Sequence, residues 1–196
     1  MNRLLSLGLA LATGMGMSLL LAACVSLPGE DAEPADRYML KGPEPNCASG
    51  GPPLILSIIK VSSGLNTDRI ARRDAATGQF TYLQGVRWVD RIGSMLEQRL
   101  AKDLECKGYS VITSHHAQLN NDQLVCEVRA LNLVQSSGNN SAEVSLSCVK
   151  FNNRGKQQDT ILSSHTSPLR SWGINDAMTA MAESYALVLE DLGSRL

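Results

Sequence analysis

Residues 123–134, QLVCEVRALNLV, and residues 141–151, SAEVSLSCVKF, carry the pattern that decides the fold. Apolar and polar residues alternate along both stretches, which is typical of β-strands with one buried face. The residues between them, SSGN at 136–139, favour a turn. The sequence therefore predicts a β-hairpin centred near Ser137.

One register of this hairpin puts an almost wholly apolar set on a single face. It pairs Leu124, Cys126, Val128 and Ala130 with Lys150, Cys148, Leu146 and Val144. Cys126 then lies directly opposite Cys148, and a slip by one residue would destroy both features. We therefore predict a Cys126–Cys148 disulfide.

The remaining cysteines extend this argument. Besides Cys24 the chain has Cys47, Cys106, Cys126 and Cys148, and no two are spaced as a CxxC pair. An even number in an oxidising compartment is typical of two disulfides, so Cys47 would pair with Cys106. Each bridge would stabilise the fold by roughly 3–4 kcal/mol, mostly by restricting the unfolded chain. The alternative is four buried free thiols.

Further strands flank the hairpin in sequence. Residues 54–61, LILSIIKV, form a continuous β-branched run that predicts a central strand covered on both faces. Two weaker strands are expected around 69–73 and 79–83. Residues 109–113 and 156–166 predict two more.

The apolar period changes to three and four residues over 86–106 and 175–193, which predicts two amphipathic helices. Their apolar positions are Trp88, Ile92, Met95, Leu96, Leu100 and Leu104 in the first, and Ala177, Met178, Met181, Tyr185, Val188, Leu189 and Leu192 in the second. We expect Trp88 to anchor the core at the start of the first helix. The predicted fold is α+β: an antiparallel-rich sheet with two long helices packed on one face.

The amino-terminal residues have the layout of a secretory signal, because Arg3 precedes a long apolar stretch, 4–23. The stretch ends in LAAC at 21–24, which looks like the lipobox of bacterial lipoprotein precursors. Cys24 would take a diacylglyceryl group on its thiol and, after cleavage, an acyl chain on its amine, and two or three chains anchor a protein stably. The alternative is an uncleaved transmembrane helix.

Composition completes the domain assignment. We expect a signal peptide at 1–23, a lipidated amino terminus and flexible tether rich in Pro, Gly and acidic residues at 24–53, and one periplasmic domain at 54–196. The net charge of −1 becomes about −2 once Arg3 is removed. Neither that charge nor 4% aromatic residues favours a nucleic-acid partner.

Candidate catalytic and metal-binding residues are few. His115 and His116 are adjacent, so in a strand they would point to opposite faces and would not chelate one ion together. Ser114 and Ser164 each precede a histidine without a G-x-S-x-G elbow around them. We therefore predict no enzyme activity, no metal site and no cofactor other than the lipid on Cys24.

Arg69, Arg72 and Arg73 lie close to Asp68 and Asp74 in the sequence. One interpretation is a solvated, salt-bridged edge strand. The other is an edge that docks a partner or a lipid headgroup, because arginine holds phosphate or carboxylate in two-pronged fashion.

Several segments together resemble a known family, the ABC-type transport auxiliary lipoproteins (PqiC-like) that accompany Mce-domain lipid transport systems. They are the lipobox, the RYML segment at 37–40, the strand at 56–61, the spaced residues Leu65, Asp68, Arg69, Ile70 and Arg73, and GVRWVDRI at 85–92. The segment after the first strand lacks the family's usual proline, and four cysteines besides Cys24 are more than the family pattern suggests.

The resemblance implies a non-catalytic lipoprotein that helps to move lipid between the inner and outer membranes. Its partners would be an Mce-domain protein, an ABC permease and an ATPase. Val25 after the lipidated cysteine implies sorting to the outer membrane. The alternative function is a structural lipoprotein that activates or helps to build an envelope enzyme complex. The sequence leaves open which lipid is moved and whether the domain forms homo-oligomers.

Overall fold

The structure is a computed structural model that describes residues 35–42, 47, 50–113 and 120–196. The predictions for Cys24, Ser114, His115 and His116 lie outside these residues. The elements in chain order are β1 (Asp36–Tyr38), β2 (Pro53–Val61), β3 (Arg69–Asp74), β4 (Phe80–Trp88), α1 (Ile92–Cys106), β5 (Ser110–Thr113), β6 (Asp122–Gln135), β7 (Ser141–Phe151), β8 (Gln157–Pro168) and α2 (Ile174–Ser194).

Strand β6 organises the sheet. One side of β6 pairs with β7 along most of its length, and β7 pairs with β8. The other side is shared, because β2 pairs with residues 122–128 and β3 with residues 132–135. β5 continues the sheet beyond β2, and β4 and then β1 continue it beyond β3. β8 and β1 therefore end two different branches of the described sheet.

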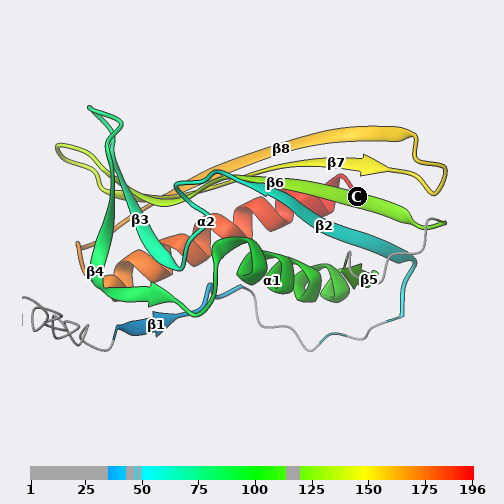
Figure 1. Cartoon of the computed structure of the whole chain (residues 1–196), viewed down its shortest axis with the longest axis horizontal. Coiled ribbons are helices and arrows are strands. Elements are labelled where there is room, and N and C mark those ends of the chain that lie inside the picture. The colour runs from blue at the N-terminus through cyan, green and yellow to red at the C-terminus, as the bar shows by residue number, and fades with distance from the viewer. Residues whose placement is uncertain (1–34, 43–46, 48–49, 114–119) are drawn as a thin grey trace, which may run out of the picture. The chain divides into compact units, whose positions relative to one another are not determined.

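The predicted α+β class is confirmed. Both helices cover the same face of the sheet: α1 packs against β2 and β5, and α2 packs against β6, β7 and β8 (Figure 1). The two longest pairings, β6–β7 and β7–β8, are antiparallel. Parallel pairing occurs where β2 and β3 meet β6. The core lies between the helices and the sheet, and Trp88, Leu124 and Tyr185 are completely buried in it.

The hairpin register is confirmed over its first half. Leu124 pairs with Lys150, Cys126 with Cys148 and Val128 with Leu146, as predicted. The expected pairing of Ala130 with Val144 is wrong, since a β-bulge after Val128 places Ala130 opposite Ser145 and Leu131 opposite Val144. The bulge keeps Leu131 and Leu133 on the buried face, which strict alternation would have turned toward solvent.

Both predicted disulfides are present. Cys126 and Cys148 are fully buried, with their Cα atoms 4.1 Å apart. Cys47 is bonded to Cys106, the last residue of α1, with a Cα–Cα distance of 4.6 Å. Gly108 follows with φ +95°, a conformation that favours glycine where a helix ends.

Two element boundaries differ from the predictions. Trp88 is the last residue of β4, and α1 begins only at Ile92. Trp88 nevertheless has no exposed surface, so its role as a core anchor is confirmed. Before Leu54, the segment at 35–42 also belongs to the fold, because β1 pairs with β4 and Leu40 is 1% exposed.

Candidate functional site: an apolar pocket beside Trp172

An apolar pocket of about 180 Å³ opens between β4, β6 and the start of α2. Aliphatic side chains make up most of its wall: Leu83, Val86, Leu133, Leu169, Ile174 and Ala177. Trp172 also lines the pocket, and 42% of this residue is exposed. A concave apolar surface beside an exposed tryptophan is a candidate binding site.

The loop that carries Trp172 is held at both ends. Ser171 donates a hydrogen bond of 2.6 Å from its Oγ to Asp176 in the first turn of α2, and its Oγ accepts one of 3.3 Å from the Gly173 N–H. At the other end of the loop, the Leu169 N–H donates to the Asn140 carbonyl at 2.8 Å. These bonds position Trp172 without burying it.

Arg72 lies over the ring of Trp172. The guanidinium carbon is 6.0 Å from the ring centroid, at the limit of a cation–π contact. The Arg72 Nε also donates a 3.1 Å hydrogen bond to the Thr81 hydroxyl, which fixes the direction of the side chain. Tryptophan and arginine are the residues most enriched at the energetic centres of protein interfaces. The pair is therefore suited to docking a protein.

The three arginines predicted as a docking group do not form one site. Arg69 lies over Tyr82, at 4.2 Å from the ring centroid, and Arg73 forms a 2.8 Å ion pair with Glu143 on β7. Arg72 and Arg73 are adjacent in β3, so they point to opposite faces of the sheet. The edge-strand prediction is wrong, because β3 lies between β4 and β6. Their docking role stays a prediction, and the pocket geometry favours Arg72.

The neighbouring carboxylates have their own partners. Asp68 binds Arg87 of β4 at 3.1 Å. Asp74 accepts hydrogen bonds from the Thr77 N–H at 2.7 Å, the Thr77 hydroxyl at 2.9 Å and the Ala76 N–H at 2.9 Å. These bonds, led by the one from the Thr77 backbone, lower the pKa of Asp74. Asp74 therefore shapes the β3–β4 turn.

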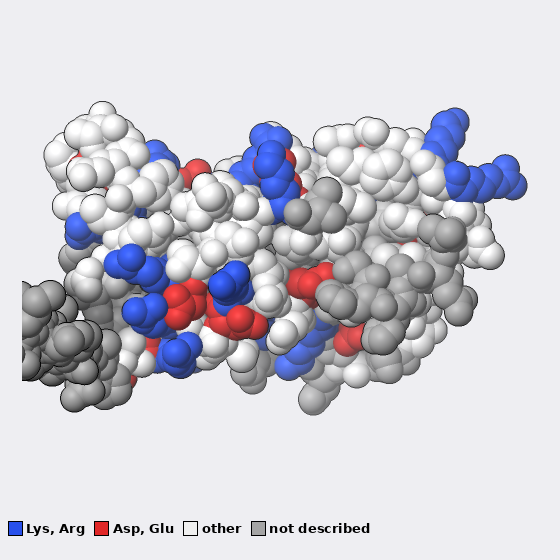
Figure 2. Space-filling model, viewed as in Figure 1, with Lys and Arg blue, Asp and Glu red and all other residues white. Residues whose placement is uncertain are grey.

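A second surface lies where β1, the end of β4 and the start of α1 meet; we call it the β1 corner. A polar groove of about 400 Å³ there is lined by Arg37, Asp68, Asp90 and Arg91 among others. An adjoining depression of about 210 Å³ is lined by Met39, Val89, Met95 and Lys102 among others, and Val89 and Asp90 border both hollows. Charged side chains of both signs gather over this region (Figure 2).

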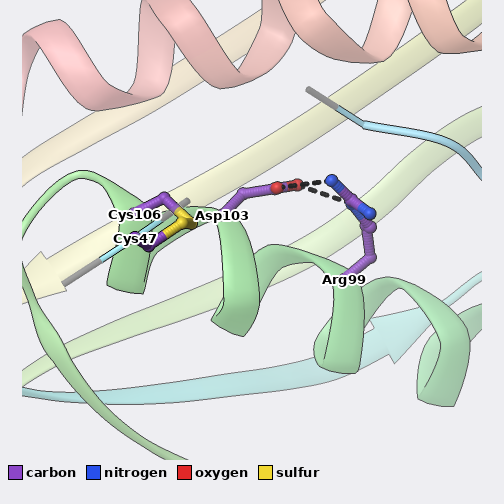
Figure 3. The surroundings of a disulfide bond; sticks show 4 residues. All are labelled: Cys47, Arg99, Asp103 and Cys106. Carbon is purple, nitrogen blue, oxygen red and sulfur yellow. Dashed lines mark hydrogen bonds and ion pairs between the residues drawn. A yellow bond between two sulfur atoms is a disulfide. The ribbon is translucent and has the colours of Figure 1, made fainter. Parts of the chain in front are cut away.

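A buried polar network joins the two helices. Arg99 donates to both carboxylate oxygens of Asp103, from Nε at 2.9 Å and from Nη2 at 2.7 Å (Figure 3). Tyr185 of α2 donates from its hydroxyl to the same carboxylate at 2.8 Å. Burial first and the Asp103 charge second raise the pKa of Tyr185 well above its usual value. The network has a structural role, because Asp103 and Tyr185 are buried away from solvent.

Sequence reasoning missed Trp172 and Asp103. A lone tryptophan in a Ser-Trp-Gly loop just before a helix is an available signal for an exposed anchor. Asp103 follows Arg99 by four residues, the spacing of an ion pair on one helix face, and falls in the apolar stripe of α1.

The other candidate residues remain separate. Ser164 and His165 are consecutive in β8, so their side chains point to opposite faces. Within the described residues, no group of His, Cys, Asp and Glu could hold a metal ion. Neither helix of the described part of the chain is long and apolar enough to span a membrane.

Comparison with known proteins establishes the fold. No protein-family model and no curated protein matches the chain. A Xanthomonas campestris protein of family DUF330 matches with a TM-score of 0.64 and 14% identity over 80% of this chain and 90% of its own. An uncharacterised protein matches with a TM-score of 0.68 and 13% identity, over 83% of this chain and 99% of its own.

A hypothetical protein of Chlamydia trachomatis has a TM-score of 0.52 and 10% identity over 74% of this chain and 95% of its own. At these identities the similarity concerns the fold alone.

Proposed function

We propose that this chain is a non-catalytic lipoprotein, anchored through Cys24 and facing the periplasm from the outer membrane, that serves an ABC/Mce-type lipid transport system. It docks on an Mce-domain protein that works with a permease and an ATPase. The observation that carries the docking role is the exposed Trp172, held in place beside an apolar pocket with Arg72 over its ring.

The geometry favours protein recognition at this site. The pocket is small, about 180 Å³, and a volume of this size suits an inserted side chain better than a whole ligand molecule. A rigid aromatic residue loses little conformational entropy on binding, and Trp172 is already positioned by the hydrogen bonds of Ser171. An aliphatic or aromatic side chain of the partner would enter the pocket against Trp172.

The transport role is supported by the segments that resemble the auxiliary lipoprotein family. Two of them are distant in sequence but meet at the β1 corner: Arg37 pairs with Arg87 and Tyr38 with Trp88 across β1 and β4. Asp68 joins them through its ion pair with Arg87, and its carbonyl accepts the Trp88 N–H at 2.7 Å. The segments at 37–40 and 85–92 and the residue Asp68 are thus connected to one another in the structure.

The proposal is tested by purifying the lipidated full chain from detergent-solubilised envelopes and identifying the proteins bound to it. We expect an Mce-domain protein, with its permease and ATPase. Trp172→Ala should weaken the complex at least about 30-fold, the effect of losing a 2 kcal/mol hot spot. Leu162→Ala is the matched control, because Leu162 is 56% exposed on β8, away from the pocket.

Each alternative has its own result. Recovery of cell-wall synthases in place of transport proteins would support the assembly function and contradict the transport role. Equal binding by Trp172→Ala, Leu162→Ala and the natural chain would contradict docking at the pocket. A thermal melt of each variant shows that the chain is still folded.

A further inference from the structure

We propose that the β1 corner rests on the headgroup layer of a bilayer containing anionic phospholipid, with Met39 and Val89 turned toward the lipid. The inference rests on the lipid anchor of the proposed function and adds a membrane-facing surface to it.

The first argument is the length of chain between the anchor and the fold. The described structure begins at Ala35 and enters β1 at Asp36. From Cys24 to Ala35 the chain advances eleven residues, which span at most about 40 Å when fully extended. An acylated Cys24 therefore keeps β1 within about 40 Å of the bilayer. The tether thus joins the fold directly at β1, which ends its branch of the described sheet.

The second argument is the pair of apolar side chains exposed at this corner. Met39 is 60% exposed and Val89 is 37% exposed, and both line the depression of about 210 Å³. The Val89 N–H donates to the Tyr38 carbonyl at 2.9 Å, so the two residues are held next to each other as β1 and β4 end. Leu40, which follows Met39, and Trp88, which precedes Val89, are buried and anchor both strands to the core.

The third argument is the charge around that pair. The exposed cations Arg37, Arg91 and Lys102 line the two hollows that Val89 borders, and the exposed Lys41 lies two residues after Met39 in the chain, whereas the chain as a whole has a net charge of −1. Asp68 and Asp90 line the same groove as Arg37 and Arg91, and Asp36 begins β1. The corner is therefore amphipathic and carries charges of both signs (Figure 2). Lysine and arginine beside exposed apolar side chains match the phosphates and upper acyl chains of a bilayer surface.

The test uses the lipidated full chain in vesicles of phosphatidylethanolamine and phosphatidylglycerol. Trp172→Phe first removes the exposed tryptophan, while Trp88 remains buried. Met39→Trp in this background then reports the β1 corner, and Leu162→Trp reports a similarly exposed position on β8. Lipids brominated on their acyl chains quench a tryptophan that enters the bilayer surface.

We expect Met39→Trp to lose emission in brominated vesicles and Leu162→Trp to keep it. Lys41→Glu with Lys102→Glu, added to Met39→Trp, should restore part of the lost emission. Equal quenching at positions 39 and 162 in chains that float with the vesicles would overturn the inference and leave the anchor standing. Failure of the natural chain to float would remove the anchor itself, and with it both proposals. If Met39→Trp is not quenched, a cross-linker attached at position 39 in cell envelopes tests for a protein at this corner. Capture of a protein there would overturn the inference.

Discussion

Tyr185 donates a 2.8 Å hydrogen bond to Asp103, which joins the middle of α2 to the end of α1 in the core. Asp103 also receives two hydrogen bonds from Arg99, whose side chain is 11% exposed. The disulfide between Cys47 and Cys106 closes one turn further along the same helix. α1 is therefore fixed on both sides near its carboxyl end.

Substitutions in this network should lower the free energy of unfolding by very different amounts. Tyr185→Phe removes the hydrogen bond from the phenol to Asp103 and leaves Asp103 paired with Arg99, so we expect a loss of about 1–2 kcal/mol in the free energy of unfolding. Asp103→Ala removes the shared acceptor of a buried ion pair and should cost about 3–5 kcal/mol. Urea denaturation of both variants measures the two values. Similar costs for the two substitutions would contradict the central position of Asp103.

The Tyr185 phenol should stay protonated while the fold persists. Its pKa is raised well above 10.0 by burial and by the Asp103 charge. The unfolded state ionises at the ordinary value, so the stability contributed by the protonated phenol is complete below pH 10.0 and is lost as the pH rises further. Phenolate absorbance in the natural chain and in Tyr185→Phe should diverge only as the chain unfolds. Divergence at pH 10.0 in folded protein would show that the phenol is accessible to base.

The two disulfides should respond differently to a mild reductant. Cys47 is exposed and Cys106 half-buried, whereas Cys126 and Cys148 have no exposed surface. Thiol–disulfide exchange requires access of the attacking thiolate, so Cys47–Cys106 should be reduced first. Alkylation followed by peptide mass spectrometry gives the order.

Replacing either pair with alanines should destabilise the chain by about 2–5 kcal/mol. The Cys47–Cys106 bridge closes a loop with a sequence separation of 59, against 22 for the other bridge. In the loop-closure model, the Cys47–Cys106 bridge therefore stabilises the fold by roughly 1 kcal/mol more than the Cys126–Cys148 bridge. Removal of the buried Cys126–Cys148 pair also costs packing in the core. Unchanged stability without Cys47 and Cys106 would show that the amino-terminal segment is not held by that bond.

The Asp74 carboxyl should titrate below its usual value of 3.8, because three donors in the turn stabilise its charged form. A lowered folded-state pKa means that this contribution to stability is present above about 3.8 and is lost as the pH falls through the pKa of Asp74 itself. Carboxyl chemical shifts followed by NMR give the midpoint. A midpoint at or above 3.8 would contradict the hydrogen-bonded turn.

The hairpin could be predicted because its two cysteines and its alternation demand one register. The bulge also left a signal, since the apolar positions change parity between Val128 and Leu131. A strict period of two cannot express that change, and so the predicted partner of Ala130 was wrong. The parallel pairing of β2 and β3 with β6 could not be predicted from the apolar pattern, because it brings together segments far apart in the chain.

The candidate site was predictable only in part. Arg72 was singled out by its neighbours in the sequence, but its partner Trp172 is separated from it by 100 residues and meets it only through packing of α2 under the sheet. The buried ion pair of Arg99 and Asp103 was missed although its i,i+4 spacing was an available signal, while Tyr185 as the third member left no signal in the sequence. Local spacing indicates pairs within one element, and tertiary packing selects the partners from other elements.

The account depends most on the anchor at Cys24, and the intact mass of the protein isolated from its own cells tests it most directly. We predict a chain that begins at Cys24 and carries the added mass of a diacylglyceryl group and an amide-linked acyl chain. A chain that keeps residues 1–23, or is cut elsewhere with an unmodified Cys24, would contradict it.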